Sequence, residues 1–302
     1  MKWITFVIVM FILVIVAFGF YQYNHRTITS PVQEVITPSQ PIRMDREPAR
    51  VITFNVGQGD AILVENNNTY MLVDCGPNSA RDELISSILI YTQKIDYLVV
   101  THPDEDHIGN CDSVLQNFTV DKVYTNGKND SSQAYKDFIS SLKGKKPEIA
   151  YKGMEFDIGN IDVEVIHSNV GYKKDNDNSV VMRMDYYNIS FLLTGDCESQ
   201  CENDLMKENI DVDFLKVAHH GSNASTSDDF LDKVTPVGAV ISVGKNSYGH
   251  PSQGLIDRMV SRGISVKITD QGGDVEIATD GKPLDKTNIP IGQKQTSAGE
   301  PL

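Results

Sequence analysis

The sequence predicts a mixed α/β fold of two or more layers. Short strand-like runs begin at Val51, helix-length segments then alternate with strands, and the same succession repeats in the second half of the chain. Strands that alternate with helices are typical of sheets whose faces are covered by helices. Two sheets packed face to face, with helices outside, would accommodate this pattern.

Composition sets further bounds on the class of protein. The chain has 302 residues, 40% hydrophobic and 23% charged, which suffices for one large or two small domains with a real core. Its net charge of −14 argues against passive, nonspecific binding of nucleic acid, which depends on a basic surface. A nuclease whose metal ions supply local positive charge remains compatible with that charge.

The amino-terminal segment predicts a transmembrane helix within residues 1–22. Trp3–Phe20 is eighteen residues long, carries no charge and follows Lys2. A helix of that length spans roughly 27 Å, close to the bilayer core. We expect an uncleaved signal anchor that holds the rest of the chain outside the cytoplasm. A cleaved signal peptide and secretion are the alternative, although Ala17-Phe18-Gly19 is a poor cleavage site.

Three regions follow the anchor. Residues 23–50 contain four prolines and no periodic pattern, which predicts an extended linker. Residues 51–282 carry the strand and helix pattern of the folded domain. The polar residues 283–302 are expected to be disordered.

Elements of the first half follow from apolar runs and turn residues. The runs VITFNVG and AILVEN flank a Gly57–Asp60 turn, and TYMLVDCG, IDYLVV and DKVYTNG predict three more strands. Helices are expected over Asp82–Thr92, Val114–Phe118 and Ser131–Leu142.

Elements of the second half repeat the alternation. Hairpins are expected across Gly159-Asn160 and near Tyr187-Asn188, and further strands in VDFLKVAHHGS and GAVISVG. Helices are expected over Ser199–Glu208, Asp228–Val234 and Leu255–Arg262. The stretch SVKITDQGGDVEIATDG predicts a closing strand pair.

The four cysteines are too few for a disulfide framework. Small buried hydrophobic side chains are the favoured interpretation. Bridges Cys75–Cys111 and Cys197–Cys201 are the alternative outside the cytoplasm.

The richest group of ligand-type residues is Thr101–Asn110, THPDEDHIGN. His102, Asp104, Asp106 and His107 follow an apolar strand, and carboxyl ends of strands are where open α/β folds place their chemistry. Because a turn directs alternate side chains to different points, His102 and Asp104 could hold one ion, and Asp106 and His107 a neighbouring one. The alternative is a merely polar loop.

Three later stretches place ligand-type residues at strand ends. They are VDCG with Asp74, FLLTGDCE with Asp196, and FLKVAHHGS with His219 and His220. Each alone is weak evidence, because Asp and Gly are common turn residues. Together they supply five or six ligands from separate strand ends.

This constellation resembles the metallo-β-lactamase superfamily. THPDEDH matches its His-x-His-x-Asp-His motif, with Asp104 in place of the second histidine. The stretches FNVGQGDAILV, NDNSVVMRM, LLTGDCE, VAHHGS and NSYGHPS, in that order, resemble the hydrolase domain of ComEC-type competence proteins, a DNA-uptake family. The likeness covers roughly Val51–Gly281 and implies a four-layer αββα sandwich with two divalent metal ions.

The resemblance also implies a ligand set. His102 and Asp104 match ligands of the first metal, and Asp106 and His107 the second-metal side. Asp196 matches the bridging aspartate and His219 the last histidine, with His220 as the alternative. The first metal's third ligand stays open, because the nearest histidine, His167, is expected at the surface.

Other residues have supporting roles. Asp74 is expected to orient a ligand histidine and Asp60 to brace the Gly57–Asp60 turn, although both remain possible ligands. Asp106 is also expected to be catalytic. His250 is expected to donate to a substrate phosphate or to act as a leaving-group acid, unless its loop backbone satisfies it. Lys216 and Ser222 could touch a phosphate.

Taken together, the sequence predicts a membrane-anchored hydrolase with two Zn²⁺ or Mn²⁺ ions, the latter because its carboxylates suit harder metals. A two-metal site suits phosphodiester hydrolysis, and the resemblance makes DNA the first candidate substrate. The alternatives are a non-catalytic DNA- or ligand-binding module on this fold, and a hydrolase of another ester or a lactam.

Overall fold

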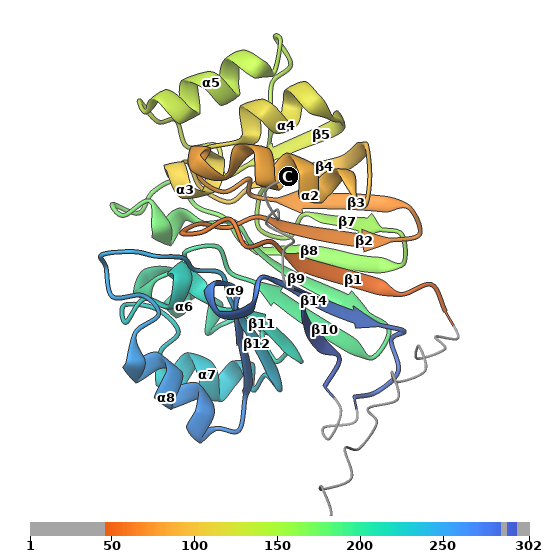
Figure 1. Ribbon diagram of the computed structural model, residues 1–302. Coiled ribbons are helices and arrows are strands. Elements are labelled where there is room, and N and C mark those ends of the chain that lie inside the picture. The colour runs from red at the N-terminus through yellow and green to blue at the C-terminus, as the bar shows by residue number, and fades with distance from the viewer. Residues whose placement is uncertain (1–45, 285–288, 295–302) are drawn as a thin grey trace, which may run out of the picture. The chain divides into compact units, whose positions relative to one another are not determined.

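The described part of the computed structural model, residues 46–284 and 289–294, contains two β-sheets packed face to face (Figure 1). The first sheet has the strand order β15-β14-β1-β2-β3-β4-β5-β6, and the second has the order β13-β12-β11-β10-β9-β8-β7. The expected anchor and nearly all of the expected linker lie outside the described residues. Within them, no helix has the length and apolar character needed to cross a membrane.

The strands and helices have the following bounds. The first sheet comprises β1 (Ala49–Thr53), β2 (Ile62–Asn66), β3 (Thr69–Val73), β4 (Lys94–Val100), β5 (Thr119–Thr125), β6 (Glu148–Ile149), β14 (Asp274–Thr279) and β15 (Ile291–Lys294). The second comprises β7 (Glu155–Ile158), β8 (Ile161–His167), β9 (Val181–Tyr186), β10 (Ile189–Leu193), β11 (Phe214–Lys216), β12 (Gly238–Ile241) and β13 (Ser265–Ile268). The α-helices are α2 (Arg81–Leu89), α3 (Glu105–Ile108), α4 (Cys111–Asn117), α5 (Gln133–Ser141), α6 (Ser199–Leu205), α7 (Asp228–Val234), α8 (Gln253–Ser261) and α9 (Thr269–Gly272).

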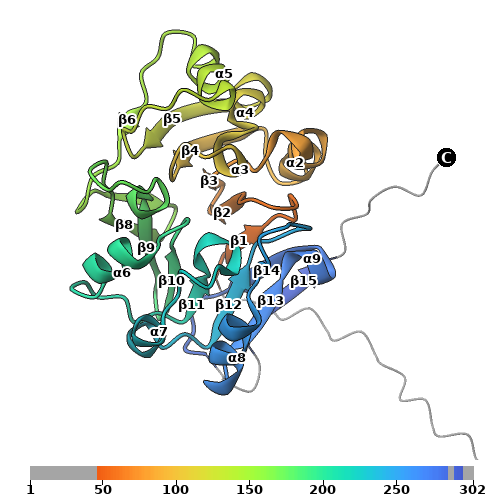
Figure 2. The same cartoon turned by 90° about the vertical axis from the view of Figure 1, so that its left-hand side faces the viewer.

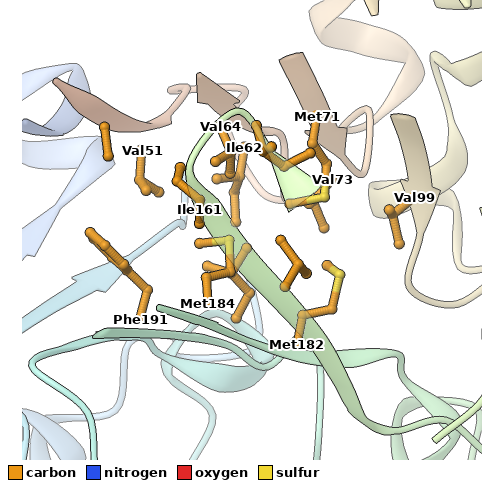
Figure 3. Packing of buried hydrophobic residues seen from close by; sticks show 14 of the residues in the cluster. Val51, Ile62, Val64, Met71, Val73, Val99, Ile161, Met182, Met184 and Phe191 are labelled. Atoms are coloured by element: carbon orange, nitrogen blue, oxygen red, sulfur yellow. The ribbon is translucent and has the colours of Figure 1, made fainter. Parts of the chain in front are cut away.

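Apolar side chains fill the space between the sheets and both outer faces. Val51 of the first sheet and Met184 and Phe191 of the second belong to the central cluster (Figure 3). The neighbouring Ile52 packs instead in a second cluster with residues of α2, α4 and α5. Successive strand residues point to opposite faces, so strands covered on both sides have continuous apolar runs. A third cluster joins the second sheet to α6, α7 and α8 (Figure 2), which gives the expected αββα layering.

Parallel strands bring the predicted ligand segments to one edge of each sheet. β3, β4 and β5 run parallel in the first sheet, and β10, β11, β12 and β13 run parallel in the second. The segments that follow the carboxyl ends of β3, β4, β10 and β11 carry Asp74, the THPDEDH motif, Asp196 and the histidine pair. The sheet topology therefore assembles the site from residues far apart in sequence.

The carboxyl-terminal expectations are wrong in two respects. The predicted closing pair does not exist, because β13 pairs with β12 in the second sheet while β14 pairs with β1 in the first. The short α9 and Gly273, with φ 84°, carry the chain from one sheet to the other. Ile291–Lys294 forms β15 against β14, so this part of the expected disordered tail is ordered. Residues 285–288 and 295–302 lie outside the described part.

Cysteine pairing also differs from the favoured expectation. The structure contains the alternative bridges Cys75–Cys111 and Cys197–Cys201, with Cα atoms 5.3 and 5.4 Å apart. Both separations suit a disulfide. The first bridge links the end of β3 to α4, and the second links the Asp196 turn to α6. Each bridge therefore begins directly after a candidate site residue.

Candidate metal centre

Asp74 organises the first sheet's contribution to the site. It lies in the left-handed region, with φ 59°, directly after β3. Its Oδ1 accepts from the Thr101 backbone N–H at 2.8 Å, and its Oδ2 accepts from the Thr101 hydroxyl and His107 Nδ1, both at 2.7 Å. Thr101 Oγ1 in turn contacts His102 Nδ1 at 3.1 Å. Asp74 thus fixes one imidazole directly and the other through Thr101, leaving each Nε2 available to the site.

Asp196 supplies the second sheet's central carboxylate. It follows β10 and is almost fully buried. Its Oδ1 lies 3.2 Å from His107 Nε2, and its Oδ2 lies 3.9 Å from His102 Nε2 and 3.6 Å from His220 Nε2. The Nε2 atom of His219 lies 3.8 Å from the same Oδ2. One carboxylate therefore faces four imidazoles, which is the arrangement expected of a bridging ligand.

The histidine pair divides into two environments. Both residues have left-handed φ, 47° and 52°, and their rings are nearly perpendicular, with centroids 6.0 Å and planes 73° apart. His220 is buried, its Nδ1 donates to the Ser242 carbonyl at 2.9 Å, and its Nε2 lies 3.1 Å from Asp106 Oδ2. The Nδ1 atom of His219 instead lies 2.9 Å from Glu198 Oε1. Both residues approach Asp196, but only His220 is buried and belongs to the groups of ligand atoms around Asp106 and Asp196, so the geometry favours His220, the alternative, over His219 as the last histidine ligand.

Four overlapping groups of ligand atoms result, with the atoms of each group within 4.8 Å of one another. His102, His107 and Asp196 form the first, and Asp106, His107 and His220 form the second. Asp60 belongs to the other two, one with Asp196 and His220 and one with Asp74 and His107, so Asp60 and Asp74 stay possible ligands. Asp104 and Asp106 lie at the rim, with side chains 41% and 31% exposed. Asp104 Oδ2 lies 3.6 Å from His102 Nε2, so it is near the first group without belonging to it.

Several buried polar atoms of the site make no well-formed hydrogen bond within the described part of the chain, even where a carboxylate oxygen lies 3.1–3.2 Å from an imidazole nitrogen. They are His102 Nε2, His107 Nε2, His220 Nε2, Asp196 Oδ1 and Asp60 Oδ1. Orphaned buried polar atoms are rare in folded proteins, because each carries an uncompensated desolvation cost. Their convergence within a few ångströms fits divalent cations, whose coordination would satisfy the three Nε2 atoms and Asp196 Oδ1; Asp60 Oδ1 lies close enough to Asp196 and His220 to join them.

The pKa shifts of the buried imidazoles and of Asp196 also favour positive charge at this site. Burial opposes the charged form of His107, but Asp196 and Asp74 outweigh it and raise the pKa of this imidazole well above its ordinary value. Burial likewise opposes protonation of His220, while Asp196, Asp106 and Asp60 raise its pKa to about 10. Burial of Asp196 is outweighed by His107 and His220, so its carboxyl pKa falls well below the ordinary value. The carboxylates thus stabilise positive charge at this site. Protons on the imidazoles or bound metal ions can supply that charge, and the two compete for the same nitrogen atoms.

Asp60 takes part in a buried ion pair. Its Oδ2 accepts from Lys216 Nζ at 2.7 Å, and the side chains are 1% and 2% exposed. Its backbone carbonyl accepts from Gly76 N–H, and its Oδ1 lies 3.5 Å from His220 Nδ1. Asp60 therefore does more than brace its own turn. Lys216 is enclosed, which corrects the expectation that it could touch a phosphate; Ser222 is also buried.

His250 lies on the loop after β12 and is partly exposed. Its ring centroid is 5.2 Å from that of His219, and its Nδ1 has no partner among the described residues. Backbone atoms of its loop therefore do not satisfy this nitrogen. Burial, together with His219 and His220, lowers the pKa of this imidazole below its ordinary value.

Two residues near the site, His167 and Glu198, differ from what the sequence predicts. His167 is buried rather than superficial, and its Nδ1 donates to the Ser179 carbonyl at 2.9 Å, away from both ligand groups. Sequence reasoning missed Glu198, which is buried and holds His219 and Lys174, the latter at 2.5 Å. Its position two residues after Asp196 was the available signal.

Comparison with known proteins agrees with the fold and the motif set. Residues 54–245 match the family model described as the metallo-beta-lactamase superfamily. The chain is 28% identical over 257 residues to ComE operon protein 3 of Bacillus subtilis, covering 74% of this chain and 32% of that protein. It is 29% identical over 234 residues to Recombination protein 2 of Haemophilus influenzae, covering 76% and 28%. With competence protein ComA of Neisseria gonorrhoeae the identity is 29% over 244 residues, covering 78% and 33%.

The chain thus spans about a third of the length of each of these relatives. Among solved structures, it is similar to the metallo-beta-lactamase fold protein YhfI of Bacillus subtilis, with TM-score 0.53, 13% identity and coverage of 76% of this chain and 99% of that one. It is also similar to Igni18, a metallo hydrolase of Ignicoccus hospitalis, with TM-score 0.52, 15% identity and coverage of 75% and 98%. Those identities are evidence of a shared fold alone. By its motif set, its fold and its family match, the chain belongs to the metallo-beta-lactamase superfamily and resembles the hydrolase domain of ComEC-type competence proteins.

Proposed function

We propose that this protein is a membrane-anchored hydrolase with two divalent metal ions that cleaves phosphodiesters, with DNA as its substrate. One observation carries the proposal. Three buried imidazoles present unpartnered Nε2 atoms to a buried carboxylate, Asp196, beside the carboxylate of Asp106. Such a donor set is costly to bury unless cations occupy it.

The ligands divide between the two ions as follows. His102 and Asp104 would hold one ion, Asp106, His107 and His220 the other, and Asp196 faces both. When bound, two divalent ions lower the pKa of water to near neutral and stabilise the charge of an in-line phosphoryl displacement. The mixture of imidazole and carboxylate ligands suits Zn²⁺ or Mn²⁺.

The chain's own residues contribute orientation and proton control. Asp74 holds His107 and, through Thr101, His102. His250, whose lowered pKa keeps the imidazole neutral near pH 7, can donate a hydrogen bond to a phosphate oxygen. His250→Ala should slow turnover while the metal ions stay bound.

Similarity to two competence proteins and to Recombination protein 2 supports DNA as the substrate. The net charge of −14 repels polyanions at long range, and salt weakens that repulsion. Because Lys216 is enclosed, affinity would come chiefly from the metal ions. We therefore expect a shallower salt dependence than a basic nuclease shows.

The proposed anchor is residues 1–22, with the hydrolase domain outside the cytoplasm. The two disulfides support an oxidising compartment. A protease added to intact cells should release the domain from the membrane fraction. Cleavage only after lysis would refute this orientation.

The test of the proposed function is turnover of fluorescent single-stranded and duplex DNA and of a simple phosphodiester, with Mn²⁺ or Zn²⁺, across salt. Asp106→Asn and His107→Ala should abolish turnover. Absence of any diester turnover by metal-loaded protein would refute the proposal. Retained DNA binding in that case would favour the non-catalytic module.

A further inference from the structure

A cavity of about 630 Å³ opens beside the candidate metal centre. Its lining includes Gln58, Asp104, Asp106, Lys245 and Tyr248. That volume lies within the range of small-molecule pockets. Asp104 and Asp106 belong to the rim of the metal centre. A ligand in the cavity would therefore lie next to the phosphodiester bond that the proposed reaction cleaves.

Tyr248 forms an exposed aromatic surface at this cavity, with 74% of the residue accessible. Asn246 fixes the loop that carries it: its Nδ2 donates to the carbonyls of Gly244 and His250, and its Oδ1 accepts from the backbone N–H groups of Tyr248 and His250. The ring therefore lies on a braced loop. Its centroid is 5.8 Å from that of His250, so aromatic rings lead from the cavity to the metal centre.

Gln58 supplies an independent sign of a ligand. Its Oε1 is buried and accepts no hydrogen bond from the described residues. A carboxamide presents an acceptor beside two donors, so it suits a partner whose edge offers both functions. Exocyclic amino groups and ring nitrogens of nucleobases form such an edge.

The negative charge of the cavity lining favours entry of the base of a nucleotide over entry of its phosphate. Carboxylates of Asp104, Glu105, Asp106 and Asp130 line it, and Lys245 is the single basic residue in its described lining. Phosphates would be repelled there unless metal ions intervened, whereas a neutral base with amino donors would not. A phosphate held at the metal centre would therefore leave the cavity to the adjoining base.

We propose that this cavity binds one unpaired nucleobase, stacked on Tyr248 with its edge toward Gln58, next to the scissile phosphate of single-stranded DNA. This inference rests on the proposed function. A base within a duplex is paired and stacked, and its extrusion costs free energy. The site should therefore prefer single strands to duplex DNA of the same sequence.

The experiment uses the metal-loaded full chain and a single-stranded oligonucleotide, with an abasic site placed in turn at each position around the cleaved bond. Removing one adjoining base should lower kcat/KM about 5- to 100-fold, the range of one base–aromatic stack. Tyr248→Ala should cause a similar loss on the intact strand and add little on that abasic strand. Tyr248→Phe should restore the intact-strand rate, and Gln58→Leu should weaken discrimination between bases with and without amino groups.

Tyr151→Ala is the matched control, because Tyr151 is 62% exposed and does not line the cavity. An equal effect of Tyr248→Ala on intact and abasic strands would overturn the inference while leaving the hydrolase intact. Quenching of 2-aminopurine fluorescence in the strand reports base binding independently of cleavage. Quenching that Tyr248→Ala abolishes, without turnover of any diester, would retain the base site and refute the proposed function.

Discussion

Replacing Lys216 by methionine should strongly destabilise the metal-free domain. Its ammonium group contacts Asp60 Oδ2 at 2.7 Å, and both side chains are at most 2% exposed. The variant leaves Asp60 as a buried carboxylate that has lost its nearest cation. Breaking a buried pair in this way costs about 3–5 kcal/mol. For a domain of this size, that loss lowers Tm by about 6–20 °C.

The assay is urea denaturation followed by circular dichroism, with a chelator present so that bound metal adds no stability. Lys207→Met is the matched control. The Lys207–Asp204 pair is 3.0 Å long, but the lysine side chain is 73% exposed, so its loss should cost at most about 1 kcal/mol.

The double variant Asp60→Asn with Lys216→Met distinguishes loss of charge balance from loss of packing. Removing both charges should recover much of the stability that Lys216→Met loses, because no unpaired ion remains. A cost below about 1 kcal/mol for Lys216→Met, or no recovery in the double variant, would refute the reasoning.

Three further predictions concern other residues. His220→Ala should remove about half of the bound metal, whereas His219→Ala should retain it; elemental analysis showing the reverse would restore His219 as the ligand. Asp74→Ala should weaken metal affinity about 10- to 100-fold in a competitive chelator titration, because both imidazoles lose their orientation, and unchanged affinity would remove Asp74 from this role. Burial lowers the pKa of His167, so the unfolded chain gains a proton near pH 6.5 that the folded chain resists. Its contribution to stability is therefore full above that pH and lost as the pH falls, and His167→Gln should flatten the pH dependence of the unfolding free energy between about pH 7.5 and 5.5.

Much of the fold is predictable because its signals are local. The alternation of apolar strands with helices between Val51 and Leu255 is confirmed, and the Gly57–Asp60 turn joins two antiparallel strands as expected. The sheet that a strand joins depends on residues far away in sequence. Nothing in SVKITDQGGDVEIATDG therefore indicates that its two strands enter different sheets. The pairing of β15 with β14 likewise depends on a partner edge that the sequence does not mark.

The candidate site shows the same division. Ligand-type residues at strand ends predict which segments meet, and the structure brings together His102, His107, Asp196 and the histidine pair. Side-chain direction decides the rest. Within the left-handed turn of the histidine pair, His220 rather than His219 lies beside Asp106, and strand alternation buries Lys216 against Asp60. Neither outcome follows from residue type or spacing.

The central claim is that two metal ions act together in hydrolysis. It is tested most directly by adding Mn²⁺ or Zn²⁺ to metal-free protein and following cleavage of a fluorescent single-stranded oligonucleotide against metal equivalents per chain. The account predicts that activity rises to a plateau at about two equivalents, and that Asp196→Asn abolishes the plateau. A plateau at about one equivalent, or no cleavage at any metal content, would contradict it.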